Sequence, residues 1–206
     1  MAYTAEDWPI TAALLQFPGV DARGVSMNGA EPEAWRAVFE EIAEAGFAHV
    51  DLTDSWVRPA DLSPARLEEL QAAASAAGVG LPVISAIRRS IIHGTNWQAN
   101  LDYSHRTLEA GAALGCEVVS FGLHEAITPE QQKQLWFWAV PGHQDPVGDE
   151  ETWGKAVTRL QELGRHAAEL GLLVSLEMYE DTYLGTADSA VRLVEDIGMP
   201  NVGLNP

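Results

Sequence analysis

The sequence predicts an α/β fold built on a parallel sheet, and two observations lead to that prediction. The first is a pattern that recurs along the 206 residues: an amphipathic helical stretch, a glycine, and a short apolar run. The second is the strict alternation of helical stretches and apolar runs, which is typical of parallel sheets covered by helices. A glycine directly after a helix supplies the left-handed conformation in which many helices end. The pattern occurs five times, with its glycines at Gly46, Gly78, Gly115, Gly171 and Gly198.

The apolar runs predict six strands, and the stretches between them predict five helices. Apolar residues three or four positions apart, such as Trp35, Phe39 and Ile42, would share one face of a helix. Ser63 before a proline predicts a helix start, and Thr186 is a predicted N-cap of the fifth helix. The strands are expected at about residues 11–17, 48–52, 81–87, 117–121, 172–178 and 201–205.

Two architectures fit this alternation: a (β/α)8 barrel and an open doubly wound sheet. The turn after the first strand, Phe17-Pro-Gly-Val-Asp-Ala-Arg-Gly24, lacks the G-x-G-x-x-G pattern of dinucleotide-binding sheets, which favours the barrel. A complete barrel needs about 250 residues. We therefore expect residues 1–206 to form a single (β/α) barrel domain that is incomplete at its C-terminal end, with strands 1–6 and helices 1–5 only.

The composition excludes several classes of protein. Twelve Lys and Arg against 30 Asp and Glu give a net charge of −18, which disfavours binding to nucleic acids and to anionic membranes. One cysteine, Cys116, allows neither an internal disulfide nor a zinc cluster. The N-terminus lacks the pattern of a signal peptide, and no apolar run is long enough to span a bilayer. These features predict a soluble cytoplasmic protein.

The functional groups of a barrel gather at the C-terminal ends of its strands. Glu177 ends the apolar run of the fifth predicted strand, where a buried carboxylate must be paired, protonated or bound to a cation. Two interpretations follow. Glu177 is either a structural glutamate in a salt bridge or a ligand of Mg²⁺ or Mn²⁺, which prefer carboxylate oxygens.

Other polar residues follow neighbouring strands. His93 comes after the third strand and His124 after the fourth, so each is a candidate substrate contact or a structural loop histidine. Arg88 and Arg89 also follow the third strand. These two arginines could bind a phosphate or carboxylate of a substrate, or simply balance charge in a very acidic chain.

The stretch Leu170-Gly-Leu-Leu-Val-Ser-Leu-Glu177, followed one unit later by Asn201-Val-Gly-Leu-Asn-Pro206, resembles the xylose isomerase-like TIM barrels. The third helical stretch, which closes on Ala112-Ala-Leu-Gly115, fits the same pattern. This superfamily contains sugar and sugar-phosphate isomerases and epimerases. The resemblance implies that Glu177 is one of four ligands of a divalent metal, Mn²⁺ or Mg²⁺. The remaining ligands, an Asp, a His and a second Glu from strands six to eight, are then expected beyond residue 206.

One segment departs from a plain isomerase pattern. The 56 residues from Gly115 to Gly171 exceed the 27 to 37 that separate the other glycines, which indicates an insertion at about residues 124–150. Long loops in compact domains are usually functional or disordered, and Trp136, Phe137 and Trp138 argue against disorder. The insertion is either a self-packed surface loop or an aromatic lid, in which Trp136 and Trp138 bind substrate and His143 serves as the catalytic acid or base.

With this insertion, the sequence is similar to the larger subunit of bacterial C-glycoside deglycosidases. That narrower resemblance implies a metal-dependent lyase that removes a proton next to a sugar carbonyl and cleaves the C–C bond of 3-oxo-C-glycosides by elimination. It also implies a small β-rich partner subunit and an oligomer. A sugar or sugar-phosphate isomerase or epimerase is the alternative function, and a non-catalytic binding module is the second alternative. Either enzyme would act on a small-molecule carbohydrate or glycoside.

Overall fold

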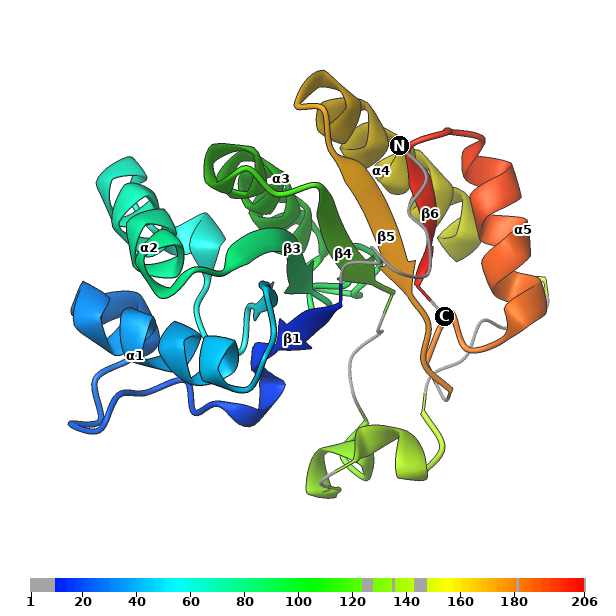
Figure 1. Cartoon of the computed structure of the whole chain (residues 1–206). Helices are drawn as coiled ribbons and strands as arrows, with labels where there is room; N and C mark the ends of the chain where they lie inside the picture. The colour runs from blue at the N-terminus through cyan, green and yellow to red at the C-terminus, as the bar shows by residue number, and fades with distance from the viewer. Residues whose placement is uncertain (1–9, 124–127, 135, 143–147, 181, 206) are drawn as a thin grey trace. The chain divides into compact units, whose positions relative to one another are not determined.

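The predicted alternation of strands and helices is confirmed by a computed structural model of the chain (Figure 1). The structure describes all residues except 1–9, 124–127, 135, 143–147, 181 and 206. The strands follow one another in sequence order in a six-stranded sheet, β1-β2-β3-β4-β5-β6. The strands are β1 (Thr11–Ala13), β2 (His49–Thr53), β3 (Gly80–Ala86), β4 (Val118–Gly122), β5 (Leu173–Glu177) and β6 (Val202–Asn205). The helices are α1 (Pro32–Glu44), α2 (Pro64–Ala77), α3 (Trp97–Leu114), α4 (Glu150–Glu169) and α5 (Ala187–Ile197).

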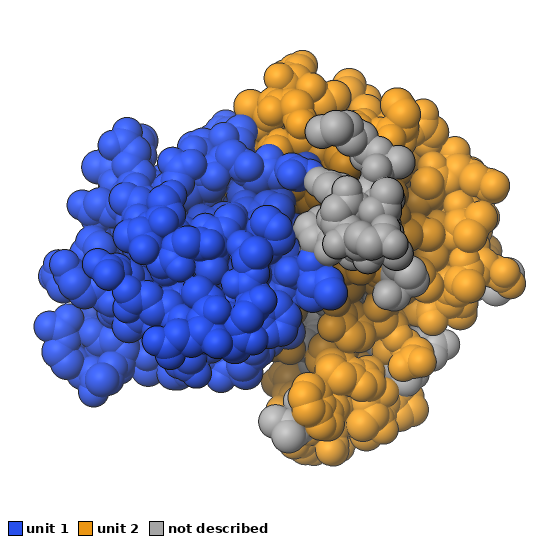
Figure 2. All heavy atoms as spheres, viewed as in Figure 1, with its two compact units in different colours: residues 1–85, 109–117 blue, residues 86–108, 118–206 orange. Residues whose placement is uncertain are grey.

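The chain is made of two compact units, which Figure 2 distinguishes by colour. The first comprises residues 1–85 and 109–117, in which β1, β2 and β3 pair in parallel. Its core is built around two aromatic rings, those of Phe39 on α1 and Trp56 after β2, whose centroids lie 5.6 Å apart. The indole of Trp35 donates a hydrogen bond to the carbonyl of Met27, so this buried ring has its polar atom satisfied.

The second unit comprises residues 86–108 and 118–206, and it contains the parallel strands β4, β5 and β6. The side chains of β5 alternate between two environments, as expected for a strand. Val174 and Leu176 are buried on the face where α4 packs against the strand. Ser175 and Glu177 therefore lie on the opposite face, where Ser175 receives a hydrogen bond from Ser120 of β4. The parallel register places Glu177 beside Asn205 of β6.

The predicted ends of the helices agree with the structure. All five glycines of the repeated pattern have positive φ angles, between 64° and 94°. The hydroxyl of Ser63 accepts a hydrogen bond from the amide of Arg66 at the start of α2. The hydroxyl of Thr186 accepts one from Ser189 at the start of α5, within a capping box.

The first predicted strand is wrong in length. We expected it at residues 11–17, but β1 ends at Ala13 and a single 3₁₀ turn, Leu14–Gln16, follows. The turn closes with a hydrogen bond from the amide of Phe17 to the carbonyl of Leu14, at 3.2 Å. A short apolar run is compatible with either conformation, and its sequence alone does not distinguish them.

The segment between β4 and α4 extends beyond the C-terminal end of β5 (Figure 1). Its described part contains two 3₁₀ turns, Gln131–Lys133 and Phe137–Ala139. The segment ends at Asp149, whose carboxylate caps α4 by accepting a hydrogen bond from the amide of Thr152. In the described part of the chain, no helix has the length and apolar character that crossing a bilayer would require.

Candidate active site

Glu177 is the last residue of β5, and its carboxylate is half-buried at the C-terminal end of the strand. Burial raises the pKa of Glu177, because a charged carboxylate loses hydration there. Two neighbours act in the opposite direction and lower this pKa: the hydroxyl of Tyr179, which donates a hydrogen bond to the carboxylate, and the positive charge of Arg88. Glu177 is thus a partly dehydrated acid, and the described residues place the Tyr179 hydroxyl and the Arg88 cation near it.

Tyr179 links Glu177 to three aromatic side chains of the segment between β4 and α4. Its ring stacks on Trp138, with centroids 5.1 Å apart and planes 24° apart, and it meets Phe137 edge to face at 5.5 Å. Trp136 extends the group, 5.2 Å from Trp138. We call Trp136, Phe137, Trp138 and Tyr179 the aromatic cluster. Burial, followed by the hydrogen bond and the charge of Glu177, raises the pKa of Tyr179 to about 12, so its hydroxyl stays protonated as a donor.

Arg88 lies shortly after β3 and reaches the same group from another part of the chain. Its guanidinium lies over the ring of Phe137, 5.4 Å from the ring centroid, which is within the range of a cation–π interaction. Its charge also acts on Glu177 and on Tyr179. Three segments that are far apart in sequence therefore meet here: the end of β5, the loop after β3 and the 3₁₀ turn Phe137–Ala139.

The structure unites only some of the residues that the sequence singled out. Trp138 is connected to Glu177 through Tyr179, and Trp136 packs on Trp138 while remaining 58% exposed. The ring of His93 hydrogen bonds elsewhere. Its Nδ1 accepts from the backbone amides of Thr95 and Asn96, at 3.2 and 3.1 Å, just before α3. His124 and His143 lie outside the described residues.

Sequence reasoning gave no role to Tyr179 and did not connect Arg88 with Glu177. A signal for Tyr179 was present, because a residue two positions after Glu177 in an extended chain projects to the same side. No local signal could have paired Arg88 with Phe137, which lies 49 positions later in the chain.

The carboxylate of Glu177 is the type of ligand that Mg²⁺ and Mn²⁺ prefer, but these cations require several oxygen donors. Among the described residues, no group of three or more His, Cys, Asp or Glu side chains is arranged to hold a metal ion. The carboxylate of Glu177 is thus compatible in type with a hard cation, while the described residues alone do not form a site that would hold one.

Comparisons with known proteins agree with the fold. The family model described as xylose isomerase-like TIM barrel matches residues 39–206. A xylose isomerase-like TIM barrel protein from Mycobacterium smegmatis, solved in complex with magnesium, is 40% identical, with a TM-score of 0.90 over 100% of this chain and 66% of that one. No curated protein matches.

Two sugar epimerases share the fold at lower identity. A 3-keto-D-glucoside 4-epimerase from E. coli is 17% identical, with a TM-score of 0.69 over 95% of this chain and 66% of that one. A D-allulose 3-epimerase from Methylomonas sp., solved in complex with D-allulose, is 13% identical, with a TM-score of 0.64 over 86% of this chain and 57% of that one. The chain thus spans two thirds or less of the length of these proteins. On the match of the family model, it belongs to the xylose isomerase-like TIM barrel family.

Proposed function

We propose that this chain carries part of the active site of a metal-dependent sugar isomerase or epimerase, which removes a proton next to a sugar carbonyl. The observation that carries the proposal is the position of Glu177. A half-buried carboxylate ends β5 beside the aromatic cluster, at the strand end where barrels of this kind keep their functional groups. The family and the presence of sugar epimerases among the structural neighbours support this class of reaction.

We propose Glu177 as one ligand of a divalent cation, Mg²⁺ or Mn²⁺. The magnesium complex of the Mycobacterium smegmatis protein supports a hard cation in a related chain. When bound, such a cation polarises the carbonyl and hydroxyl oxygens of a sugar. Tyr179 would hold the carboxylate in one orientation through its hydroxyl, which prepares Glu177 to bind a cation.

The aromatic cluster is the proposed platform for the sugar. Trp138 has one ring face against Tyr179, and Trp136 is largely exposed beside it. Apolar faces of sugar rings pack well on indoles. We propose Trp136 and Trp138 as substrate contacts and His143 as the acid or base, since imidazole exchanges protons near neutral pH. His93 and His124 remain proposed substrate contacts. For His93 only Nε2 would serve, because Nδ1 is engaged with backbone amides.

A second candidate function is the elimination reaction of a C-glycoside deglycosidase. The observation that favours it is the exposed indole of Trp136, which extends the aromatic cluster beyond the area that a single sugar ring needs and could hold a flat aglycone. This function would require a small β-rich partner subunit within an oligomer. An isomerase would act on a free sugar without that subunit. The net charge of −18 argues against nucleic acid or an anionic membrane as partner, and we expect a cytoplasmic enzyme.

The test compares two glutamates that lie three residues apart. In the full-length protein, Glu177→Gln should reduce bound Mg²⁺ or Mn²⁺ at least about 10-fold, because a neutral amide replaces a charged ligand. It should also abolish exchange of the proton next to a ketose carbonyl in D₂O. The control Glu180→Gln alters an exposed side chain and should change neither. If metal content and exchange survive in Glu177→Gln, Glu177 is a structural acid.

A second variant tests the acid or base. His143→Ala should lower the exchange rate about 100-fold or more, the usual contribution of a general acid or base, while leaving metal content intact. An unchanged exchange rate would exclude His143 from this role. Metal binding without exchange on any sugar would favour the binding module.

A further inference from the structure

Arg88 differs from most other cationic side chains in that it forms no ion pair with an acidic residue among those that the structure describes. Arg36, Arg66, Lys155 and Arg192 each form an ion pair with a glutamate, as Arg23 and Arg58 do with an aspartate. The guanidinium of Arg88 forms no hydrogen bond or ion pair with any residue that the structure describes, although the chain carries 30 acidic side chains. An arginine whose donors meet no acceptor among the described residues, in so acidic a chain, is a candidate for binding a ligand.

An aromatic ring packs against one face of the Arg88 guanidinium. The ring of Phe137 lies against the guanidinium at 5.4 Å, and Phe137 is itself buried within the aromatic cluster. A guanidinium over an aromatic face keeps its N–H donors at its edge, where they remain available for hydrogen bonds. Arg88 is nevertheless an exposed residue, so a ligand from solution can reach it.

The surroundings of Arg88 place it within the proposed active site. Its charge acts on the carboxylate of Glu177 and on the hydroxyl of Tyr179, so all three groups share one neighbourhood. The guanidinium is not paired with that carboxylate. The next residue, Arg89, adds a second positive charge to this loop, with its guanidinium 4.6 Å from the ring centroid of Tyr103.

We propose that Arg88 forms an oxyanion subsite, which selects substrates that carry a phosphate or carboxylate group. This inference rests on the proposed sugar-binding function of the Glu177 site. The planar fork of a guanidinium matches two oxygens of a phosphate or carboxylate and binds them by paired, charge-assisted hydrogen bonds. A chain with a net charge of −18 repels anions at long range, so a local cation is needed to admit one.

The test measures binding rather than turnover. Isothermal titration of the metal-loaded, full-length protein would use four probes: inorganic phosphate, D-fructose 6-phosphate, D-glucuronate and neutral D-fructose. Arg88→Gln should weaken the binding of the preferred anionic probe about 10- to 100-fold, the effect of losing a charge-assisted hydrogen-bond pair. The affinity for D-fructose should stay within about two-fold. Arg88→Lys keeps the charge but loses the paired N–H donors of the guanidinium. Its affinity for the anionic probe should lie between those of the wild type and of Arg88→Gln.

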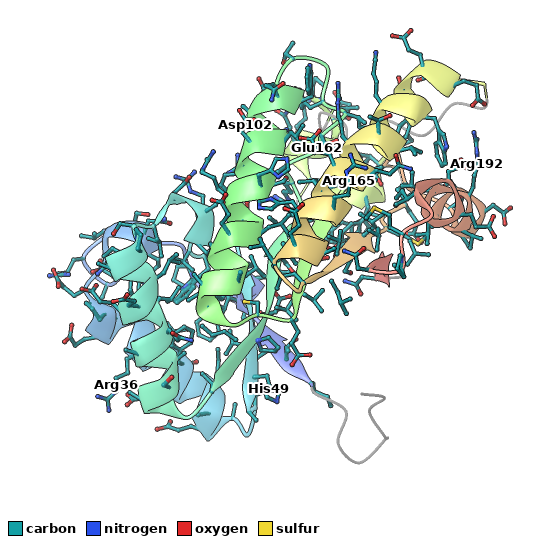
Figure 3. The ribbon with its side chains drawn as sticks, turned by 90° about the horizontal axis from the view of Figure 1, so that it is seen from above. Arg36, His49, Asp102, Glu162, Arg165 and Arg192 are labelled. Carbon is teal, nitrogen blue, oxygen red and sulfur yellow. The ribbon has the colours of Figure 1, made fainter. Side chains whose placement is uncertain are left out.

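Arg165→Gln is the matched control. Arg165 is an exposed arginine on α4 (Figure 3), and it too forms no ion pair with the described residues. Because it lies on a helix rather than at the strand ends, its removal should leave all four affinities unchanged. A similar loss for Arg165→Gln would mean that only the overall charge matters, and the subsite would be refuted.

The other outcomes are equally decisive. A preference for D-fructose 6-phosphate identifies a phosphate subsite, and a preference for D-glucuronate identifies a carboxylate subsite. If Arg88→Gln lost affinity for anionic and neutral sugars equally, the inference would be refuted, because Arg88 would then only support Phe137. Unchanged anion binding would refute it too. Failure of the proposed function appears separately, as a protein that binds these probes but exchanges no proton.

Discussion

The Nδ1 atoms of His105 and His166 lie 2.8 Å apart, and this contact joins α3 to α4. A hydrogen bond between two such atoms requires one ring to donate its N–H and the other to accept with a lone pair. Glu162 also lies on α4 (Figure 3). Its carboxylate oxygen lies 3.0 Å from the Nε2 atom of His105 and accepts a hydrogen bond from it. Both ring nitrogens of His105 on α3 thus contact side chains of α4.

The hydrogen bond between these two rings should contribute to stability. His166→Phe keeps a ring of similar size but removes the nitrogen that faces His105, so we expect the free energy of unfolding to drop by about 1 kcal/mol, the usual net value of one hydrogen bond. Urea unfolding would measure the drop, and an unchanged free energy of unfolding would contradict the prediction.

Tyr179→Phe should weaken metal binding without disturbing the aromatic cluster. The variant keeps the ring that stacks on Trp138 and removes the hydroxyl that donates to Glu177. Because that hydrogen bond lowers the pKa of Glu177, its loss raises this pKa and leaves less ionised carboxylate in mildly acidic solution. We expect about a 10-fold loss of Mg²⁺ or Mn²⁺ affinity, the usual order for a partner of a metal ligand, and a loss that grows as the pH is lowered. A loss independent of pH would show that the hydroxyl acts in another way.

Replacing Trp136 or Trp138 by alanine should have different effects on stability. Trp138 is half-buried against Tyr179, so Trp138→Ala should lower the free energy of unfolding by about 0.5–1.5 kcal/mol and also raise KM. Trp136 is 58% exposed, so Trp136→Ala should change stability by less than about 0.5 kcal/mol while still raising KM. Thermal unfolding and steady-state kinetics together separate the two effects. A normal KM in both variants would exclude the aromatic cluster as a sugar platform.

Two glycines of α4 offer a matched test of its packing. A Cβ atom at Gly164 would lie 2.8 Å from the sulfur of Met199 and 3.0 Å from a methyl of Val202. The overpacking at Gly164 should cost about 1–3 kcal/mol and the helix propensity of alanine should return about 1 kcal/mol, so Gly164→Ala should destabilise the protein by up to about 2 kcal/mol. Gly154 is exposed with no atom within 4 Å of such a Cβ, so Gly154→Ala should stabilise by about 0.5–1 kcal/mol. Calorimetry would show opposite shifts, and a stabilised Gly164→Ala would mean that Met199 moves aside.

The sequence predicted the features that depend on neighbours in the chain. The helix ends at Gly78 and Gly198 follow from local backbone chemistry, and the structure confirms them. It did not predict that His93 accepts hydrogen bonds from the backbone amides of Thr95 and Asn96, because such local acceptors are usually Ser, Thr, Asp or Asn side chains. Contacts between distant segments, such as Arg88 with Phe137, depend on how the chain folds back on itself, which no local pattern encodes.

The alternation of side chains along β5 has a consequence for how this site can change by mutation. Val174 and Leu176 are buried toward the helices. Glu177 lies on the other face because it directly follows Leu176 and side chains alternate along a strand. Inserting or deleting a single residue inside Leu173–Glu177 would exchange the two faces and direct an acid into the apolar layer under α4. A point substitution in this strand changes one side chain and can later be reversed. Inserting or deleting one codon would instead remove the site in a single step.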